Sequence, residues 1–212
     1  LVECLEAQRC AYEALDGTAA VTRDAKRRGQ GWLPGLADIG WSNRLGWYEG
    51  FDVLVSVNPT GAITGFGFGS ASTKDQPLAE TFFALRACPD PRLPTVGAPA
   101  HGPYVTDKGF EGHARHRHWQ EAYGAQVICA PKRNSLHPWP RAWRRWLAGI
   151  RQIVETVNGR LQHQFRLDRE RPHALDGFQV RLAAKMGLHN FCIWLNRQLG
   201  RNPLAFADLV TW

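Results

Sequence analysis

The sequence has no apolar run close to the roughly 18 residues of a membrane span, and no charged and then apolar secretory leader opens it. Its five cysteines are scattered and form no Cys-x-x-Cys pair, which argues against a disulfide framework and against a zinc ribbon. Internal repeats and low-complexity segments are lacking as well. We therefore expect a soluble, intracellular protein with reduced cysteines.

The length, the composition and the charge are informative. The chain has 212 residues, of which 44% are hydrophobic, so one large domain over residues 1–212 is favoured over two small ones. A net charge of +7 points to a polyanionic partner, because a basic surface attracts phosphate. Nine tryptophans accompany this charge, and aromatic rings beside arginines can stack on bases as well as fill a core. Residues 41–49, with Trp41, Arg44, Trp47 and Tyr48, are a candidate lining of a nucleic-acid groove.

The hydrophobic pattern predicts strands alternating with helices. Residues 51–57 and 63–69 flank an Asn-Pro-Thr-Gly turn, which predicts a hairpin. In the long helix expected over residues 141–164, the stripe that we expect to be buried includes Trp143 and Trp146. The remaining expected elements are short strands before Asp107 and over 126–130, and helices over 75–86, 111–123 and 175–199.

Three acidic residues lie on separate predicted elements. Asp107 follows a short apolar strand, and Gly109 lets the backbone turn sharply toward the next helix. Asp16 closes an apolar run, which predicts that it lies at a strand end, and Glu155 lies within the long helix. Carboxylates on separate elements can converge on a divalent metal, and Mg²⁺ prefers oxygen ligands.

Each acid also has an ordinary structural alternative. Asp107 and Asp16 could be turn aspartates, and Glu155 could form an i, i+4 salt bridge with Arg151 on a solvated helix face. Two nearby acids are rivals for the role of Asp16, namely Asp24 and Asp38. Two aspartates at the predicted hairpin and helix starts fit turn or capping roles and are less favoured for the site, namely Asp52 and Asp75.

Two motifs carry a resemblance to a known family. The stretch Asp-Lys-Gly-Phe that begins at Asp107 resembles an Asp-x-Gly-aromatic motif, and Arg151 with Glu155 resembles an Arg-x3-Glu motif. The Asp-Gly-Thr stretch at Asp16 matches a third, less specific motif. From about residue 15 to residue 196, the chain is similar to the catalytic domain of DDE transposases from bacterial insertion sequences.

This resemblance implies an α/β fold of the ribonuclease H-like class, with a central mixed sheet flanked by helices. It implies a transposase that performs metal-dependent DNA strand cleavage at transposon ends and strand transfer into target DNA. Asp16, Asp107 and Glu155 would be the catalytic residues and the ligands of two Mg²⁺ ions, with Mn²⁺ as a substitute. It further implies a homodimer in a synaptic complex with DNA, in the bacterial cytoplasm at the nucleoid and without membrane association.

The chain departs from the family in two respects. The family often has a lysine seven residues beyond the glutamate, where this sequence has Gln162. Arg160 and Lys185 are the candidates to replace the contact that this lysine makes with the transposon end. The sequence starts at Leu1 rather than at methionine, so we expect an upstream DNA-binding module to be absent.

Basic residues lie in blocks that are expected to contact phosphate, the first of them in a predicted loop over residues 23–31. Three histidines, at positions 113, 116 and 118, are an alternative zinc site, but a basic helix face near phosphate is favoured because no cysteine lies near them in the sequence. The predicted DNA-binding residues are Arg23, Lys26, Arg27, Arg28, Lys108, Arg115, Arg117, Lys132, Arg133, Arg144, Arg145 and Arg151.

Two other functions remain open at this point. The chain could be a catalytically silent or domesticated DNA-binding remnant of a transposase, which the departure at Gln162 and the start at Leu1 favour. It could also be a different ribonuclease H-like nuclease, such as a resolvase or an RNA–DNA hybrid nuclease. All three acids are intact, so an active transposase is the leading hypothesis.

Overall fold

The computed structural model of the chain describes residues 2, 4–7, 9–24, 26, 31–42, 44–88, 102–132 and 135–210. Three of the predicted DNA-binding residues, Arg27, Arg28 and Arg133, lie outside these ranges. Among the described helices, none combines the length and the apolar character that a membrane span requires. All five cysteines are free thiols, in agreement with the sequence prediction.

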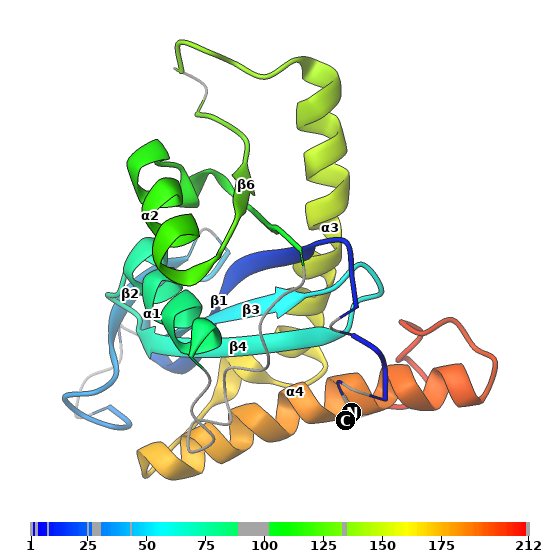
Figure 1. Ribbon diagram of the computed structural model, residues 1–212. Coiled ribbons are helices and arrows are strands. Elements are labelled where there is room, and N and C mark those ends of the chain that lie inside the picture. Colours follow the sequence, from blue (N-terminus) through cyan, green and yellow to red (C-terminus); the bar gives the residue numbers. More distant parts are fainter. Residues whose placement is uncertain are drawn as a thin grey trace.

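The centre of the molecule is a six-stranded mixed sheet (Figure 1). The strand order is β2-β3-β1-β5-β6. Strands β2 and β4 pair with successive parts of one edge of β3, and β1 pairs with the other edge. Strands β1 to β4 pair antiparallel, whereas β5 and β6 are parallel to β1. The strands are β1 (Glu13–Asp24), β2 (Asp38–Ser42), β3 (Gly46–Val57), β4 (Ile63–Ser70), β5 (Tyr104–Thr106) and β6 (Val127–Cys129).

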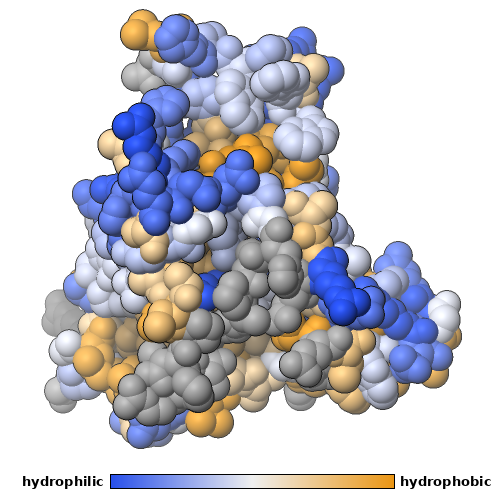
Figure 2. All heavy atoms as spheres, in the orientation of Figure 1, coloured by the Kyte–Doolittle hydropathy of each residue, from blue (hydrophilic) through white to orange (hydrophobic). Residues whose placement is uncertain are grey.

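Four helices flank this sheet, two on each face. Side chains alternate between the faces along a strand, so that Ala14 and Ala20 of β1 pack with α3 and α4, whereas Leu15 packs with α1 and α2. The helices are α1 (Asp75–Ala87), α2 (His113–Tyr123), α3 (Arg141–His163) and α4 (Leu175–Gln198), with short 3-10 turns at Lys108–Phe110 (η1) and Leu167–Arg169 (η2). Figure 2 shows hydrophilic side chains gathered over α2, which agrees with its sequence of histidines and arginines. This arrangement confirms the α/β prediction and is consistent with a ribonuclease H-like fold.

A buried ion pair joins β1 to α1 beneath the sheet. Arg86 donates hydrogen bonds to both carboxylate oxygens of Glu13, at 2.6 and 3.2 Å, and Ser56 of β3 donates to the same carboxylate. Glu13 and Arg86 are almost completely buried. Two hydrogen bonds between the charged groups fix the orientation of α1 against β1 and β3.

The structure corrects three sequence predictions. Asp16 lies within β1 rather than at its end, because β1 continues its pairing with β3 as far as Asp24. For the same reason Arg23 lies in this strand and not in a loop, and it pairs with Glu49. The predicted buried stripe of α3 is wrong at Trp143 and Trp146, which are 60% and 59% exposed because the first turns of this helix extend beyond the sheet (Figure 1).

Candidate active site

The three predicted acids line one pocket of about 720 Å³. Asp16 comes from β1, Asp107 follows the end of β5, and Glu155 projects from α3. We call this site the acidic pocket. Its lining residues are Asp16, Gly17, Thr18, Ala19, Trp41, Ser42, Arg44, Leu45, Tyr48, Asp52, Asp75, Asp107, Arg151, Glu155, Asn158, Gly159 and Gln162.

Local structure determines how each acid is presented. Asp107 caps η1, where its Oδ1 accepts a hydrogen bond from the backbone N–H of Gly109 at 2.7 Å. Asp16 is largely buried, and one of its oxygens lies 3.4 Å from the amide nitrogen of Asn158 on α3. The Glu155 side chain is 56% exposed at the mouth of the pocket. Of these three carboxylates, one is largely buried, one caps a turn and one is exposed.

Arg151 lies between two of these acids. Its Nη2 is 3.7 Å from Oδ1 of Asp16 and 3.7 Å from Oε1 of Glu155. The expected i, i+4 salt bridge with Glu155 is thus present, and the same guanidinium also approaches Asp16 of the sheet. Arg151 Nε is buried and has no hydrogen-bond partner among the described residues. One cation therefore partly compensates the two carboxylates.

The electrostatics of the pocket favour protonation of Asp16. Burial, which is the largest effect, and the negative charges of Asp107 and Glu155 together raise the pKa of Asp16 to about 6, against the opposing effect of Arg151. A buried carboxylate near like charges has a raised pKa because its ionised form loses hydration and is repelled. A bound cation would remove both penalties.

Sequence reasoning missed a fourth acid in the pocket. It assigned Asp75 to an ordinary capping role, but the structure places this side chain between β1 and η1. A Cβ added at Gly109 would lie 3.0 Å from Asp75 Oδ2 and 2.9 Å from Asp107 Oδ1, and one added at Gly17 would lie 3.5 Å from Asp75 Oδ1. Burial raises the pKa of Asp75, and the charge of Asp107 raises it further. The position of Asp75 at a helix start after a strand, like that of Asp107, was the only signal in the sequence.

Asp52 also lines the pocket and was assigned to a turn. It lies within β3, where the hydroxyl of Tyr48 donates a hydrogen bond to its carboxylate. Burial, which is the largest effect, and the charge of Asp75 together raise the pKa of Asp52 to about 6, against the Tyr48 hydrogen bond. Asp52 is therefore tied to a neutral partner on the sheet. The rivals considered for Asp16, Asp24 and Asp38, do not line the acidic pocket.

The donor chemistry of the pocket fits a hard divalent cation, because its donors are carboxylate and amide oxygens. Asn158 supplies an amide oxygen that is buried and has no hydrogen-bond partner among the described residues. Within the described ranges, however, no group of three or more His, Cys, Asp or Glu side chains lies close enough together to hold a metal ion. Arg151 lies between Asp16 and Glu155, and ionised carboxylates repel one another, so both effects oppose a closer approach of these acids.

The α2 histidines give no support to the zinc alternative. His116 Nε2 lies 2.7 Å from the carbonyl oxygen of Phe110, whereas His118 Nε2 lies 2.8 Å from a carboxylate oxygen of Glu80. These two rings therefore have separate partners, and no metal-binding group is found among the described histidines.

The position of the family lysine is buried in this chain. Gln162 is 2% exposed, and its amide donates hydrogen bonds to Thr18 Oγ1, at 2.8 Å, and to the carbonyl of Ala19. The two proposed substitutes are engaged elsewhere. Arg160 donates to the Leu204 carbonyl and stacks over Phe206, while Lys185 pairs with Glu170. Neither lines the acidic pocket, so neither is positioned to replace that lysine.

The described basic residues of the predicted DNA-binding set are dispersed. Only Arg151 lies in the acidic pocket, and Arg23 and Lys26 line a neighbouring groove. Lys132 lies near Glu111, with 3.7 Å between Nζ and Oε2. The others lie on helices, namely Lys108 on η1, Arg115 and Arg117 on α2, and Arg144 and Arg145 on the extended end of α3.

Comparison with known proteins agrees with this geometry. Residues 14–191 match the family model described as the transposase DDE domain. The matched span begins next to Glu13, ends within α4 and includes all three predicted acids. No curated protein matches the chain significantly.

Proposed function

The chain belongs to the transposase DDE domain family, a family of enzymes that act on DNA, and we propose that its acidic pocket cuts one DNA strand and then joins it to a target. In the first step the oxygen of water attacks a phosphorus, and the bond to the 3′ oxygen breaks, leaving a 3′ hydroxyl. In the second step this hydroxyl attacks the phosphorus of a target phosphodiester and displaces the oxygen that linked this phosphorus to the neighbouring nucleotide. One bond is made for each bond broken, so the joining step requires no energy source.

The observation that carries this proposal is the convergence of Asp16, Asp107 and Glu155 on one pocket from three different elements. DDE transposases generally use divalent metal ions, and we propose Mg²⁺, with Mn²⁺ as a substitute, held by these three carboxylates. Two such ions would activate the attacking oxygen and stabilise the leaving oxygen. The raised pKa of Asp16 supports this assignment, because burial and then the nearby negative charges penalise its ionised form, and a cation bound there would offset both penalties.

Arg151 has a second role in this proposal. Its guanidinium lies between Asp16 and Glu155. When those carboxylates bind metal, the guanidinium is free to turn toward the scissile phosphate, where a planar bidentate donor suits phosphate oxygens. The pocket thus retains a compensating cation in both states.

A nicking assay on supercoiled DNA tests the proposal. With Mg²⁺ or Mn²⁺ the protein should nick the DNA, and Ca²⁺ should not support nicking because its larger and looser coordination shell positions the attacking oxygen poorly. Asp16→Asn, Asp107→Asn and Glu155→Gln should each abolish nicking while leaving DNA binding nearly intact. Glu121→Gln, on the exposed surface of α2, is the matched control and should nick like the parent.

The outcomes separate the alternatives. If one of the three variants nicks within about tenfold of the parent, which is roughly 1.4 kcal/mol of barrier, that residue is not a ligand of the essential metal. A preference for four-way junctions or for RNA–DNA hybrids over plain duplex would favour a different ribonuclease H-like nuclease. Absence of activity on every substrate would favour a silent remnant. The synaptic homodimer remains a prediction.

A further inference from the structure

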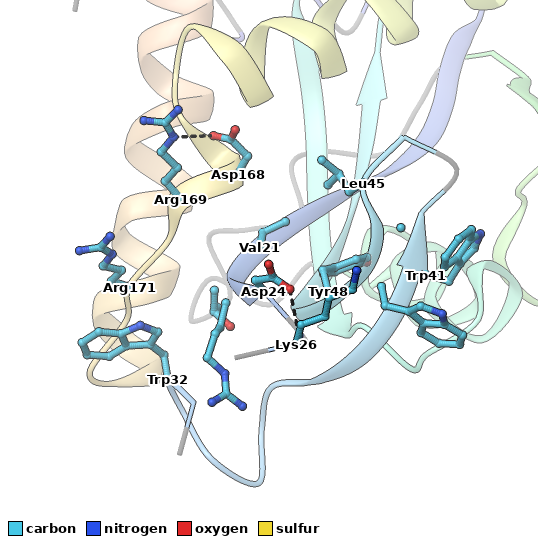
Figure 3. A pocket seen from close by; sticks show the side chains of 14 residues that line it. Val21, Asp24, Lys26, Trp32, Trp41, Leu45, Tyr48, Asp168, Arg169 and Arg171 are labelled. Atoms are coloured by element: carbon cyan, nitrogen blue, oxygen red, sulfur yellow. Dashed lines mark hydrogen bonds and ion pairs between the residues drawn. The ribbon is translucent and has the colours of Figure 1, made fainter. Parts of the chain in front are cut away.

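A second groove opens beside the acidic pocket (Figure 3). Its volume is about 820 Å³, and it lies between the end of β1, the β2–β3 hairpin and the segment that follows η2. Trp41, Leu45 and Tyr48 line both this groove and the acidic pocket, so the two share a wall. We call it the tryptophan groove. Its other lining residues are Val21, Thr22, Arg23, Asp24, Lys26, Trp32, Gly46, Trp47, Asp168, Arg169 and Arg171.

One wall of the groove presents two exposed indole rings. Trp41 and Trp47 are paired directly across the β2–β3 hairpin, and their ring centroids are 5.3 Å apart in an edge-to-face arrangement. They are 58% and 60% exposed. Two adjacent tryptophans that leave this much apolar surface in water are typical of a binding surface.

The opposite wall is basic. Figure 3 shows Arg169, Arg171 and Trp32 on the side of the groove opposite Trp41. Trp32 packs edge-on against His173, with 4.6 Å between ring centroids, which holds this wall in place. Lys26 is exposed between the two walls. Among the described lining residues, four are cationic and two, Asp24 and Asp168, are anionic, so the groove has a net positive charge.

The tip of the hairpin is braced above the acidic pocket. Nη1 of Arg44 lies 2.9 Å from Nε2 of His163 at the end of α3. This contact connects the wall that bears Trp41 to the helix that carries Glu155. The position of this wall is therefore fixed relative to the helix that lines the acidic pocket.

We propose that the tryptophan groove binds unpaired DNA nucleotides next to the scissile phosphate. Bases stack on Trp41 and Trp47, and Lys26, Arg169 and Arg171 hold the phosphates. An unpaired strand offers base faces to one wall and phosphates to the other, whereas the base faces of a duplex are covered by their neighbours. The proposal rests on the proposed function, because it is the acidic pocket that makes DNA the occupant.

Binding without metal tests the groove separately from catalysis. In EDTA, anisotropy of a labelled 12-nucleotide oligothymidine and of a 12-base-pair duplex gives the two affinities. Trp41→Ala/Trp47→Ala should weaken binding of the single strand by about tenfold or more and of the duplex by less than about twofold, because stacking needs an open base face. Trp41→Phe should retain most of the affinity. Trp143→Ala/Trp146→Ala is the matched control, because these tryptophans are equally exposed but lie on α3, outside the groove, and its loss on the single strand should be less than about twofold.

The remaining arms decide between occupants. Arg169→Glu/Arg171→Glu should weaken both ligands and flatten the salt dependence of single-strand binding. An equal loss on both ligands from the double tryptophan variant, or an equal single-strand loss from the control pair, overturns the proposal. A changed oligomeric state in the double tryptophan variant, with unchanged DNA binding, overturns it in favour of self-association through the groove.

A nicking arm keeps this proposal distinct from the proposed function. The double tryptophan variant should nick a duplex more slowly than the parent in Mn²⁺. Three unpaired nucleotides at the cut should speed nicking by the parent but not by the variant, because only the parent can hold them. If the parent binds the single strand through the tryptophans but never nicks, the groove stands and the proposed catalysis fails. If nicking is normal in the variant on both substrates, the groove fails and the catalysis stands.

Discussion

The acidic pocket and the tryptophan groove share a wall but have opposite charges. Among the described residues, the pocket is lined by five acids and two arginines, whereas the groove is lined by four cations and two acids. A DNA strand needs both environments, because cations attract its phosphates and carboxylates bind the metal that acts on one of them. We expect the groove to hold DNA with or without metal, whereas the acidic pocket should repel phosphate until a cation enters.

The largest expected effect is the salt dependence of DNA affinity, which comes from the basic residues. If about six phosphates are neutralised, the logarithm of DNA affinity should fall with the logarithm of salt at a slope of roughly −5, a loss of about a thousandfold between 50 and 200 mM. Phosphate contacts do not read bases, so the loss should be the same on unrelated duplex sequences. Equilibrium titrations in EDTA measure the slope.

Arg144→Glu/Arg145→Glu on the extended end of α3 should flatten this duplex slope alongside the groove variants. A slope near zero in the parent, or strong discrimination between unrelated duplexes, would mean that phosphate contacts are not the main source of affinity.

The next largest effect is expected in the acidic pocket, where loss of one charge should make the protein more stable. The fold raises the pKa of Asp16 from 3.8 to about 6, so its ionised form destabilises the metal-free protein at neutral pH. Asp16→Asn removes that charge, and Arg151 keeps Glu155 as a partner. We expect the free energy of unfolding to rise by up to about 3 kcal/mol at pH 7.5, although nicking is lost.

The pH dependence fixes the sign of this effect. Below about pH 4 Asp16 is protonated in both the folded and the unfolded state, so the variant should have no advantage there; the advantage should develop between about pH 4 and 6 and be complete above. Urea unfolding in EDTA across this range measures it. Glu155→Gln, whose parent side chain is exposed, should change stability by less than about 0.5 kcal/mol. An Asp16→Asn variant less stable than the parent at pH 7.5 would show that Arg151 outweighs burial.

Local periodicity predicted most elements of the fold. Strand β4 and the helices α1, α3 and α4 begin and end within about two residues of their predicted bounds, because hydrophobic spacing and turn residues are local signals. Strand β3 ends where predicted but begins at Gly46, five residues before the predicted start. Helix α2 begins two residues later than predicted, because η1 and Gly112 precede it. Strand β2 was not predicted, since its five residues expose Ile39 and Trp41 and resemble a loop.

Errors in the predicted site come from contacts that are distant in the sequence. The period of α3 predicts its apolar stripe correctly at Leu147 and Val154, but it cannot show that the sheet ends before Trp143. Asp75 was missed because its role depends on the strand order that brings the start of α1 beside Asp107. The convergence of Asp16, Asp107 and Glu155 was predicted only through the family motifs, since nothing in the spacing of residues 16, 107 and 155 requires it.

The smallest expected effect tests whether Asp75 binds metal or only adds charge. Its carboxylate lies beside that of Asp107, and burial, followed by repulsion from Asp107, raises the pKa of Asp75. If Asp75 acts through charge alone, Asp75→Asn should weaken Mn²⁺ binding by on the order of 1 kcal/mol, or about fivefold, because the lost attraction acts through partly solvated surroundings. Nicking at saturating Mn²⁺ should then stay within about threefold of the parent. Titration of Mn²⁺ by calorimetry and nicking at saturating metal give both quantities.

Asp52→Asn is the matched control, because its carboxylate is tied to Tyr48 and its loss should weaken Mn²⁺ binding less. Loss of nicking in Asp75→Asn as complete as in Asp107→Asn would make Asp75 a fourth ligand, and an equal effect of Asp52→Asn would mean that the charge of the whole pocket, and not the position of Asp75, determines metal affinity.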